Sequence, residues 1–125
     1  MTFRPYLLGL LAEVYTALGR PAEGWHIFDE ALGLVEKTGE RLHEAELDRL
    51  KGELLLKPPV LDEYQAEACF QQALAIAHQQ QARPWELRAA LSLSRLWQHQ
   101  GKPHEARALL APIYGWFTEG FDTAD

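Results

Sequence analysis

Apolar residues recur along this chain at the spacing of an amphipathic helix. The stretch AEACFQQALAIA places Ala66, Phe70, Ala73 and Ala77 on one stripe, with mostly polar residues between them. Residues three, four or seven apart share a face of an α-helix, whereas a strand alternates with a period of two. The pattern therefore predicts a helix. It also raises a question, because alanine buries little apolar area on the face that should pack.

Prolines and glycines divide the chain into six such segments. The prolines precede apolar-periodic segments, as residues of a first helical turn do, and the glycines follow them, as helix-ending residues do. They are Pro5, Pro21, Pro84 and Pro103, and Gly19, Gly39 and Gly101. The predicted helices are Pro5 to Leu18, Pro21 to Lys37, Arg41 to Leu56, Glu63 to Gln80, Pro84 to Gln100 and Pro103 to Phe117. No strand is predicted.

Short links between these helices predict three antiparallel hairpins. The hairpins repeat in sequence: Tyr15, Leu55 and Trp97 are 40 and 42 residues apart in the first helices. In the second helices Phe28, Phe70 and Leu110 are 42 and 40 residues apart. A period near 40 indicates a repeat array. We expect one all-α domain over residues 1–125, with repeats at about 5–39, 40–82 and 83–117 and a tail at 118–125.

Aligning the second helices explains the alanines. Small residues lie one turn before and one turn after a large one in each repeat. The aligned sets are Gly24, Ala66 and Ala106, then Phe28, Phe70 and Leu110, then Ala31, Ala73 and Ile113. Small residues let the second helix approach the backbone of its partner, and the large residue fills the groove between them.

This small, large, small spacing, preceded by an aromatic residue or leucine, resembles the tetratricopeptide repeat. The best instance is LLAEVYTALGRPAEGWHIFDEAL, and the matching residues of the three repeats are Ala12, Tyr15, Gly24, Phe28 and Ala31, then Gly52, Ala66, Phe70 and Ala73, then Ser94, Leu110 and Ile113. The resemblance implies a right-handed α-solenoid of three antiparallel hairpins. The period exceeds the usual 34 residues, so HEAT-like repeats stay open as an alternative.

Two further stretches, EKTGERLHEAELDRLKGELLL and the segment from AEACFQQALAIA to FDTAD, look like the C-terminal repeats of large bacterial signalling proteins. Those proteins carry a class III adenylate cyclase or winged-helix module, then a nucleotide-binding ATPase, then such repeats. The resemblance implies a scaffold or sensor region that binds a protein or peptide, or other domains of the same parent polypeptide. It also implies that the chain is a fragment or a truncated relative. A small-ligand sensing helical-repeat domain of a transcriptional regulator is the alternative.

Composition narrows the partners. The formal net charge is -6, and the 12 Lys and Arg residues form no basic run, so nucleic acid is not expected as a partner. No segment approaches the roughly 20 apolar residues that span a bilayer, and the apolar run LLGLLA is interrupted by Glu13, unlike a secretory signal. The lone Cys69 predicts a buried thiol in a reducing compartment. We therefore expect a cytoplasmic protein that does not bind membranes.

Candidate catalytic chemistry is sparse. The histidines have no pair at the spacing that chelates a metal on one helical face, so surface histidines are expected. They are His26, His43, His78, His99 and His104. Ser92 and Ser94 lie within a helix without a nucleophile-elbow context, and no glycine-rich phosphate loop is present. The sequence predicts a protein that is not an enzyme, with no metal and no cofactor.

The remaining candidate site is the concave groove of the array, which the first helices of the hairpins line. The residues expected to face it are Tyr6, Gly9, Glu13, Thr16, Glu46, Arg49, Glu53, Arg88, Leu91, Arg95 and Gln98. Such a groove is acidic at one end and basic at the other. A solvated face of mixed charge is the alternative to a binding groove.

The segment YGWFTEGFD is rich in aromatic residues for the end of a chain. Trp116, Phe117 and Phe121 would be costly to expose, so we expect them to cap the last hairpin. A partner-binding patch, or self-association through this C-terminal end, is the alternative.

Overall fold

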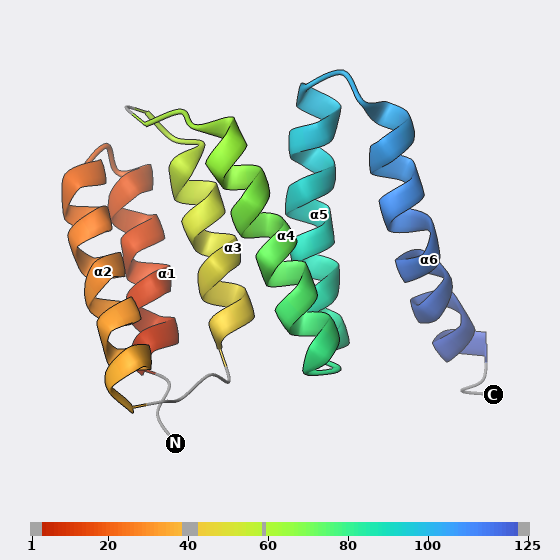
Figure 1. Ribbon diagram of the computed structural model, residues 1–125, viewed down its shortest axis with the longest axis horizontal. Coiled ribbons are helices and arrows are strands. Elements are labelled where there is room, and N and C mark those ends of the chain that lie inside the picture. Colours follow the sequence, from red (N-terminus) through yellow and green to blue (C-terminus); the bar gives the residue numbers. More distant parts are fainter. Residues whose placement is uncertain (1–3, 39–42, 59, 123–125) are drawn as a thin grey trace.

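The protein is all-helical. The computed structural model describes residues 4–38, 43–58 and 60–122, and within them it contains helices and no strand (Figure 1). The helices are α1 (Arg4–Ala17), α2 (Pro21–Thr38), α3 (Glu44–Leu55), α4 (Glu63–Gln79), α5 (Arg83–His99) and α6 (Pro103–Asp122). The six predicted helices are confirmed. In the described part of the chain, no helix combines the length and apolar character that crossing a membrane requires.

The helices form a row in which sequence neighbours lie side by side. Figure 1 shows the row running from α1 and α2 at the left to α6 at the right, with consecutive helices antiparallel. Helices α1 and α2, α3 and α4, and α5 and α6 pair as hairpins, and α4 also packs on α5. Helix α3 contacts α1 and α5, so the first helices of the three hairpins adjoin one another. This packing is consistent with a helical repeat bundle.

Three of the links share one way of ending a helix. Gly19 and Gly101 adopt φ angles of 80° and 78°, in the left-handed region that glycine enters without steric cost. Gln81 does the same with φ 56°, although no glycine marks that position. The residue after each donates its N–H to a carbonyl five positions earlier: Arg20 to Tyr15 at 2.9 Å, Ala82 to Ala77 at 2.9 Å and Lys102 to Trp97 at 2.8 Å. Gly39, the other predicted helix end, lies outside the described residues.

Helix α6 is longer than the sequence predicted. It runs to Asp122, so the expected non-helical tail at 118–125 is wrong as far as the structure describes it. The helix contains Pro112 and also passes through Gly115. A glycine inside a helix costs only about 1 kcal/mol, which is too little to end it. The predicted third helix begins at Arg41, outside the described residues; α3 is seen from Glu44.

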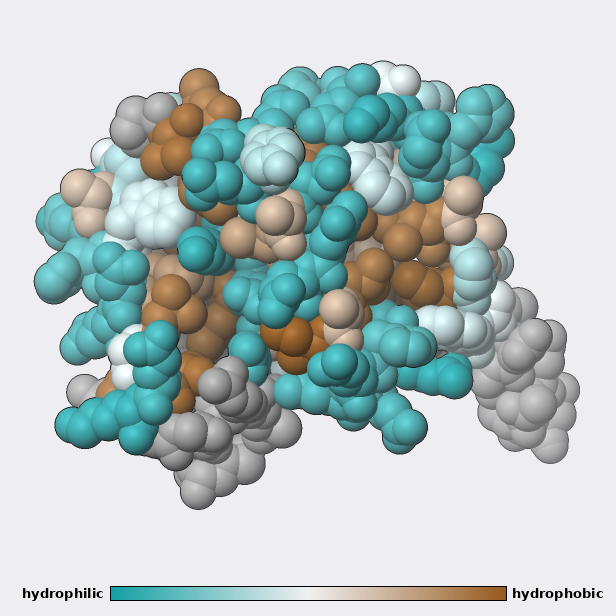
Figure 2. Space-filling view, in the orientation of Figure 1, coloured by the Kyte–Doolittle hydropathy of each residue, from teal (hydrophilic) through white to brown (hydrophobic). Residues whose placement is uncertain are grey.

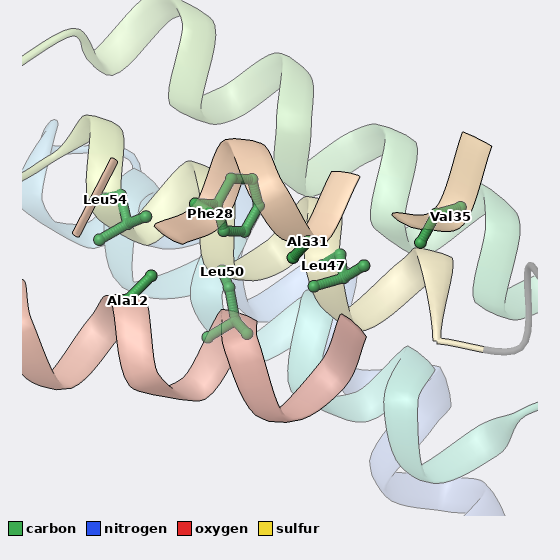
Figure 3. Close-up of a cluster of buried hydrophobic side chains, with 7 residues drawn as sticks. All are labelled: Ala12, Phe28, Ala31, Val35, Leu47, Leu50 and Leu54. Atoms are coloured by element: carbon green, nitrogen blue, oxygen red, sulfur yellow. The ribbon is translucent and has the colours of Figure 1, made fainter. Parts of the chain in front are cut away.

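Two clusters of buried side chains form the core. The first joins α1, α2 and α3 through Ala12, Phe28, Ala31, Val35, Leu47, Leu50 and Leu54 (Figure 3). The second joins α3, α4 and α5 through Leu55, Ala66, Phe70, Leu93 and Leu96. Each cluster therefore includes residues of two successive hairpins, and α3 contributes to both.

The predicted seam of small residues is confirmed. Ala66, Ala73 and Ala77 have no exposed surface. A Cβ atom added to Gly24 would lie 2.7 Å from the carbonyl oxygen of Ala12, and one added to Gly52 would lie 2.7 Å from the ring of Phe70. Both distances are below van der Waals contact, so a side chain at either glycine would force the helices apart.

Candidate binding face of the first helices

The predicted groove residues of α3 and α5 lie on two adjoining helices, but they differ in exposure. Arg88, Arg95 and Gln98 are exposed, while Glu53 and Leu91 are half-buried. On α1, Glu13 is half-buried and Thr16 is buried, donating its hydroxyl to the carbonyl of Ala12 at 2.9 Å. The side chain of Tyr6 lies outside the described part of the chain.

Glu46 and Arg49 do not project into an open groove, and that expectation is wrong. The relative exposure of Glu46 is 1% and that of Arg49 is 8%. The Arg49 Nε donates to Glu46 Oε1 at 2.6 Å, and the Arg88 Nε lies 3.1 Å from both carboxylate oxygens of Glu46. Burial is tolerated because the carboxylate is neutralised from its own helix and from α5.

This charge cluster ties the second hairpin to the third. Arg49 Nη1 also lies 3.4 Å from the hydroxyl of Ser92, which is 2% exposed and belongs to α5. The sequence had placed these residues on one face, but it gave no sign that they bond to each other. The consequence for the groove is that its charges are partly used internally. Arg95 and Glu53 remain as the charged groups that face solvent nearer the other end of α5.

A concavity lies beside this cluster, between α3, α4 and α5. Its volume is about 260 Å³. It is lined by Glu53, Leu56, Leu61, Glu63, Ser92, Arg95, Leu96 and His99. The leucines supply apolar wall, whereas the carboxylates, Arg95 and His99 supply charges of both signs; His99 Nε2 lies 3.9 Å from Glu63 Oε2.

Only part of this lining was predicted. Glu53 and Arg95 were named as groove residues, whereas Leu61, Glu63 and His99 were not. Leu61 comes from the link between α3 and α4, where its φ angle is 49°, and no pattern in the sequence indicated where that link lies. The aligned repeat positions could have pointed to Leu56, because it precedes the link on the same helix as Glu53.

A second concavity, of about 470 Å³, lies between the start of α5 and the later turns of α6. His78 Nδ1 is 3.2 Å from Glu86 Oε2, and the guanidinium of Arg83 lies 4.7 Å from the ring centroid of Trp116. The contact with Arg83 places half-buried Trp116 against the last hairpin, as the capping interpretation predicts for this residue. The side chains of Phe117 and Phe121, which that interpretation also involves, lie outside the described residues.

The histidines are exposed with one exception. His43 is 7% exposed and its ring centroid is 5.1 Å from that of Trp85, so the expectation of a surface side chain is wrong there. The aromatic face of Trp85 offers imidazole an apolar contact that sequence spacing could not indicate, since the two residues are on different helices. Within residues 4–38, 43–58 and 60–122, no group of three or more His, Cys, Asp or Glu side chains could hold a metal ion.

Two titratable groups lie between α3 and α4. Burial, and then the nearby carboxylate of Glu44, raises the pKa of Asp48 to about 6. Burial also raises the pKa of the Cys69 thiol, which keeps it protonated and weakly nucleophilic at neutral pH. Cys69 is half-buried, less than the predicted buried thiol.

Comparison with known proteins adds no further residue to this face. No family model, no curated protein and no solved structure matches the chain. The fold and the site therefore define the class alone: an all-helical protein of paired helices, with a concavity of mixed charge where the second and third hairpins meet.

Proposed function

We propose that this chain is a protein-interaction module that binds a partner segment on the face of its first helices. The observation that carries the proposal is the concavity of about 260 Å³ where Glu53 of α3 and Arg95 of α5 meet. Both residues were predicted from the repeat alone to face a groove. An apolar wall with charges of both signs suits a peptide that inserts one apolar side chain and pairs its flanking charges.

The Glu46 cluster supports this role by fixing the face. Its bonds from Arg49 and Arg88 hold α3 and α5 at a set distance, so the concavity between them is formed before a partner arrives. A preformed site avoids the cost of ordering the protein on binding. The elongated row of helices also presents more face than a compact bundle of the same length would.

The proposed setting follows from the sequence resemblance. The module would be a tetratricopeptide-like, right-handed solenoid acting as the scaffold or sensor region of a cytoplasmic bacterial signal-transduction ATPase or adenylate cyclase. Its partner would be a protein or peptide, including other domains of the same polypeptide. The reading frame that encodes the chain tests this setting. A nucleotide-binding or cyclase module encoded upstream supports it, and an unrelated module contradicts it.

Peptide selection tests the binding face. Random peptides displayed on phage are selected on the wild-type chain, and dissociation constants of the winners are measured by fluorescence anisotropy. Arg95→Gln and Glu53→Gln should each weaken binding by about fivefold or more, the effect of losing about 1 kcal/mol of a charged contact. Glu30→Gln is the matched control, because Glu30 is exposed on α2. Peptides that bind all three variants equally would place the site elsewhere.

A further inference from the structure

Helix α1 carries an exposed apolar stripe. Leu7 is 59% exposed, Leu11 43% and Val14 51%, and Leu18 just beyond the helix is 68% exposed. Their spacings of four, three and four residues place them along one helical face. Singly exposed leucines are ordinary in proteins, but a continuous stripe on one helix indicates a surface that packs.

The repeat shows what such a stripe packs against. Shifting by 40 and then 42 residues, as Tyr15, Leu55 and Trp97 align, brings Leu7 to Leu47 and Ala89. These two equivalents are each 1% exposed. The same shift brings Val14 to Leu54 and Leu96, which are 2% and 3% exposed. Position for position, the residues that are exposed on α1 are buried on α3 and α5.

The buried equivalents all lie against the preceding hairpin. Leu47 and Leu54 of α3 belong to the cluster that contains Phe28 of α2, and Leu93 and Leu96 of α5 belong to the cluster that contains Phe70 of α4. Each first helix therefore uses this stripe to pack on the hairpin before it. The stripe of α1 has the composition to do the same.

The last hairpin carries the matching surface. Leu110 aligns with Phe28 and Phe70, which have no exposed surface, yet Leu110 is only half-buried. It lines a groove of about 350 Å³ along α6 together with Gln98, Pro103, Ala106, Arg107, Ala111 and Tyr114. In the view of Figure 2, hydrophobic surface is exposed both over the first hairpin and between α5 and α6, at the two ends of the row.

We infer that the α1 stripe of one copy of this chain binds the α6 groove of a second copy, so that the row of helices continues from copy to copy. This contact would repeat the interface that already joins the three hairpins within the chain. Charge favours it as well: Glu53 and Arg95 occupy aligned positions on either side of the concavity between α3 and α5, and the aligned residue on α1 is Glu13. Arg95 of one copy would thus face Glu13 of the next, with opposite charge.

Such an interface joins two different surfaces and does not close on itself. Sedimentation velocity of the wild-type chain from about 10 µM to about 1 mM, a range that detects weak association, should show a mean mass that rises steadily from 14.2 kDa and passes the dimer. A monomer at every concentration would overturn the inference and would leave peptide binding on the first-helix face unaffected.

Paired variants identify the two surfaces. Leu7→Glu with Val14→Glu changes the α1 stripe, and Ala111→Glu with Tyr114→Glu changes the α6 groove. All four positions are exposed, so circular dichroism should be unchanged. Each double variant should be monomeric alone, and their equimolar mixture should form a dimer that grows no further, because only one intact surface of each kind remains.

Two results would contradict this arrangement. If the α6 variant still dimerises alone while the α1 variant does not, two α1 stripes pair with each other. If the mixture of variants stays monomeric, the stripe and the groove do not bind. Tyr64→Glu is the matched control, because Tyr64 is 87% exposed on α4 and lies on neither surface; this variant should associate like the wild type.

Discussion

Two glycines of helix α2 should respond in opposite ways to the same substitution. Gly24 lies against α1, where an added Cβ would come within 2.7 Å of the carbonyl oxygen of Ala12 and would also meet the side chain of Thr16. Gly33 is further along the same helix, and no atom lies within 4 Å of its Cβ position. Gly24→Ala and Gly33→Ala therefore add one methyl group to one helix in two different environments.

The expected magnitudes follow from these environments. Alanine in place of glycine inside an exposed part of a helix stabilises a protein by roughly 0.5–1 kcal/mol, so Gly33→Ala should raise stability by about that amount. Gly24→Ala gains no more than this and must overfill a packed seam, which costs about 1–3 kcal/mol. A backbone carbonyl cannot rotate away as a side chain can, so the cost should lie near the upper end. The two variants should differ by about 2–3 kcal/mol.

Thermal unfolding followed by circular dichroism measures this difference. In a domain of this size 1 kcal/mol corresponds to about 4 °C in Tm. Gly33→Ala should melt above the wild type and Gly24→Ala several degrees below it, and urea midpoints should give the same order. If both variants melted together, α1 and α2 would not approach as closely as the structure shows, and the role of the small residues would be refuted.

Three other substitutions test neighbouring parts of the core. Ala73→Leu should cost about 1–3 kcal/mol by overfilling the seam, while Gln72→Leu on the exposed side of α4 should be nearly neutral; equal effects in urea melts would misplace the seam. Glu46→Leu should cost about 3–5 kcal/mol by leaving Arg49 buried without its carboxylate, and adding Arg49→Met should restore part of that loss; a less stable double variant would contradict this. Asp48→Asn should raise the urea midpoint at pH 7 and bring little change near pH 4, because the folded-state pKa of about 6 exceeds the usual 3.8 and the cost of the buried charge disappears as pH falls through 6; a pH-independent difference would show that Asp48 does not titrate in this range.

The helices could be read from the sequence because each one carries its own signals. Pro21 and Pro103 begin α2 and α6, and the spacing of Ala66, Phe70, Ala73 and Ala77 identifies the buried face of α4. The period of small and large residues also predicted the close approach at Gly24. These features depend on residues a few positions apart, so one sequence contains them.

Other features depend on contacts between helices and could not be read in this way. The periodicity placed Glu46, Arg49 and Arg88 on exposed faces, because charged residues are usually solvated. They bond to one another only because α3 and α5 adjoin at one register. His43 is buried for the same reason, since its partner Trp85 lies on another hairpin. The left-handed conformation of Gln81 also escaped prediction, because no glycine marks it.

Helix α3 contacts every described helix except α6, whereas α6 contacts α5 alone. Within the described residues, the backbones of the first and last hairpins do not approach each other, so α3 and α4 connect them. At 12 residues α3 is too short to form a stable helix alone in water, and its neighbours must order it. Hydrogen exchange would therefore be slowest in α3 and fastest in α6, and the chain would open from its last helix inward. A load applied at one end would reach the other only by deforming this central helix and α4.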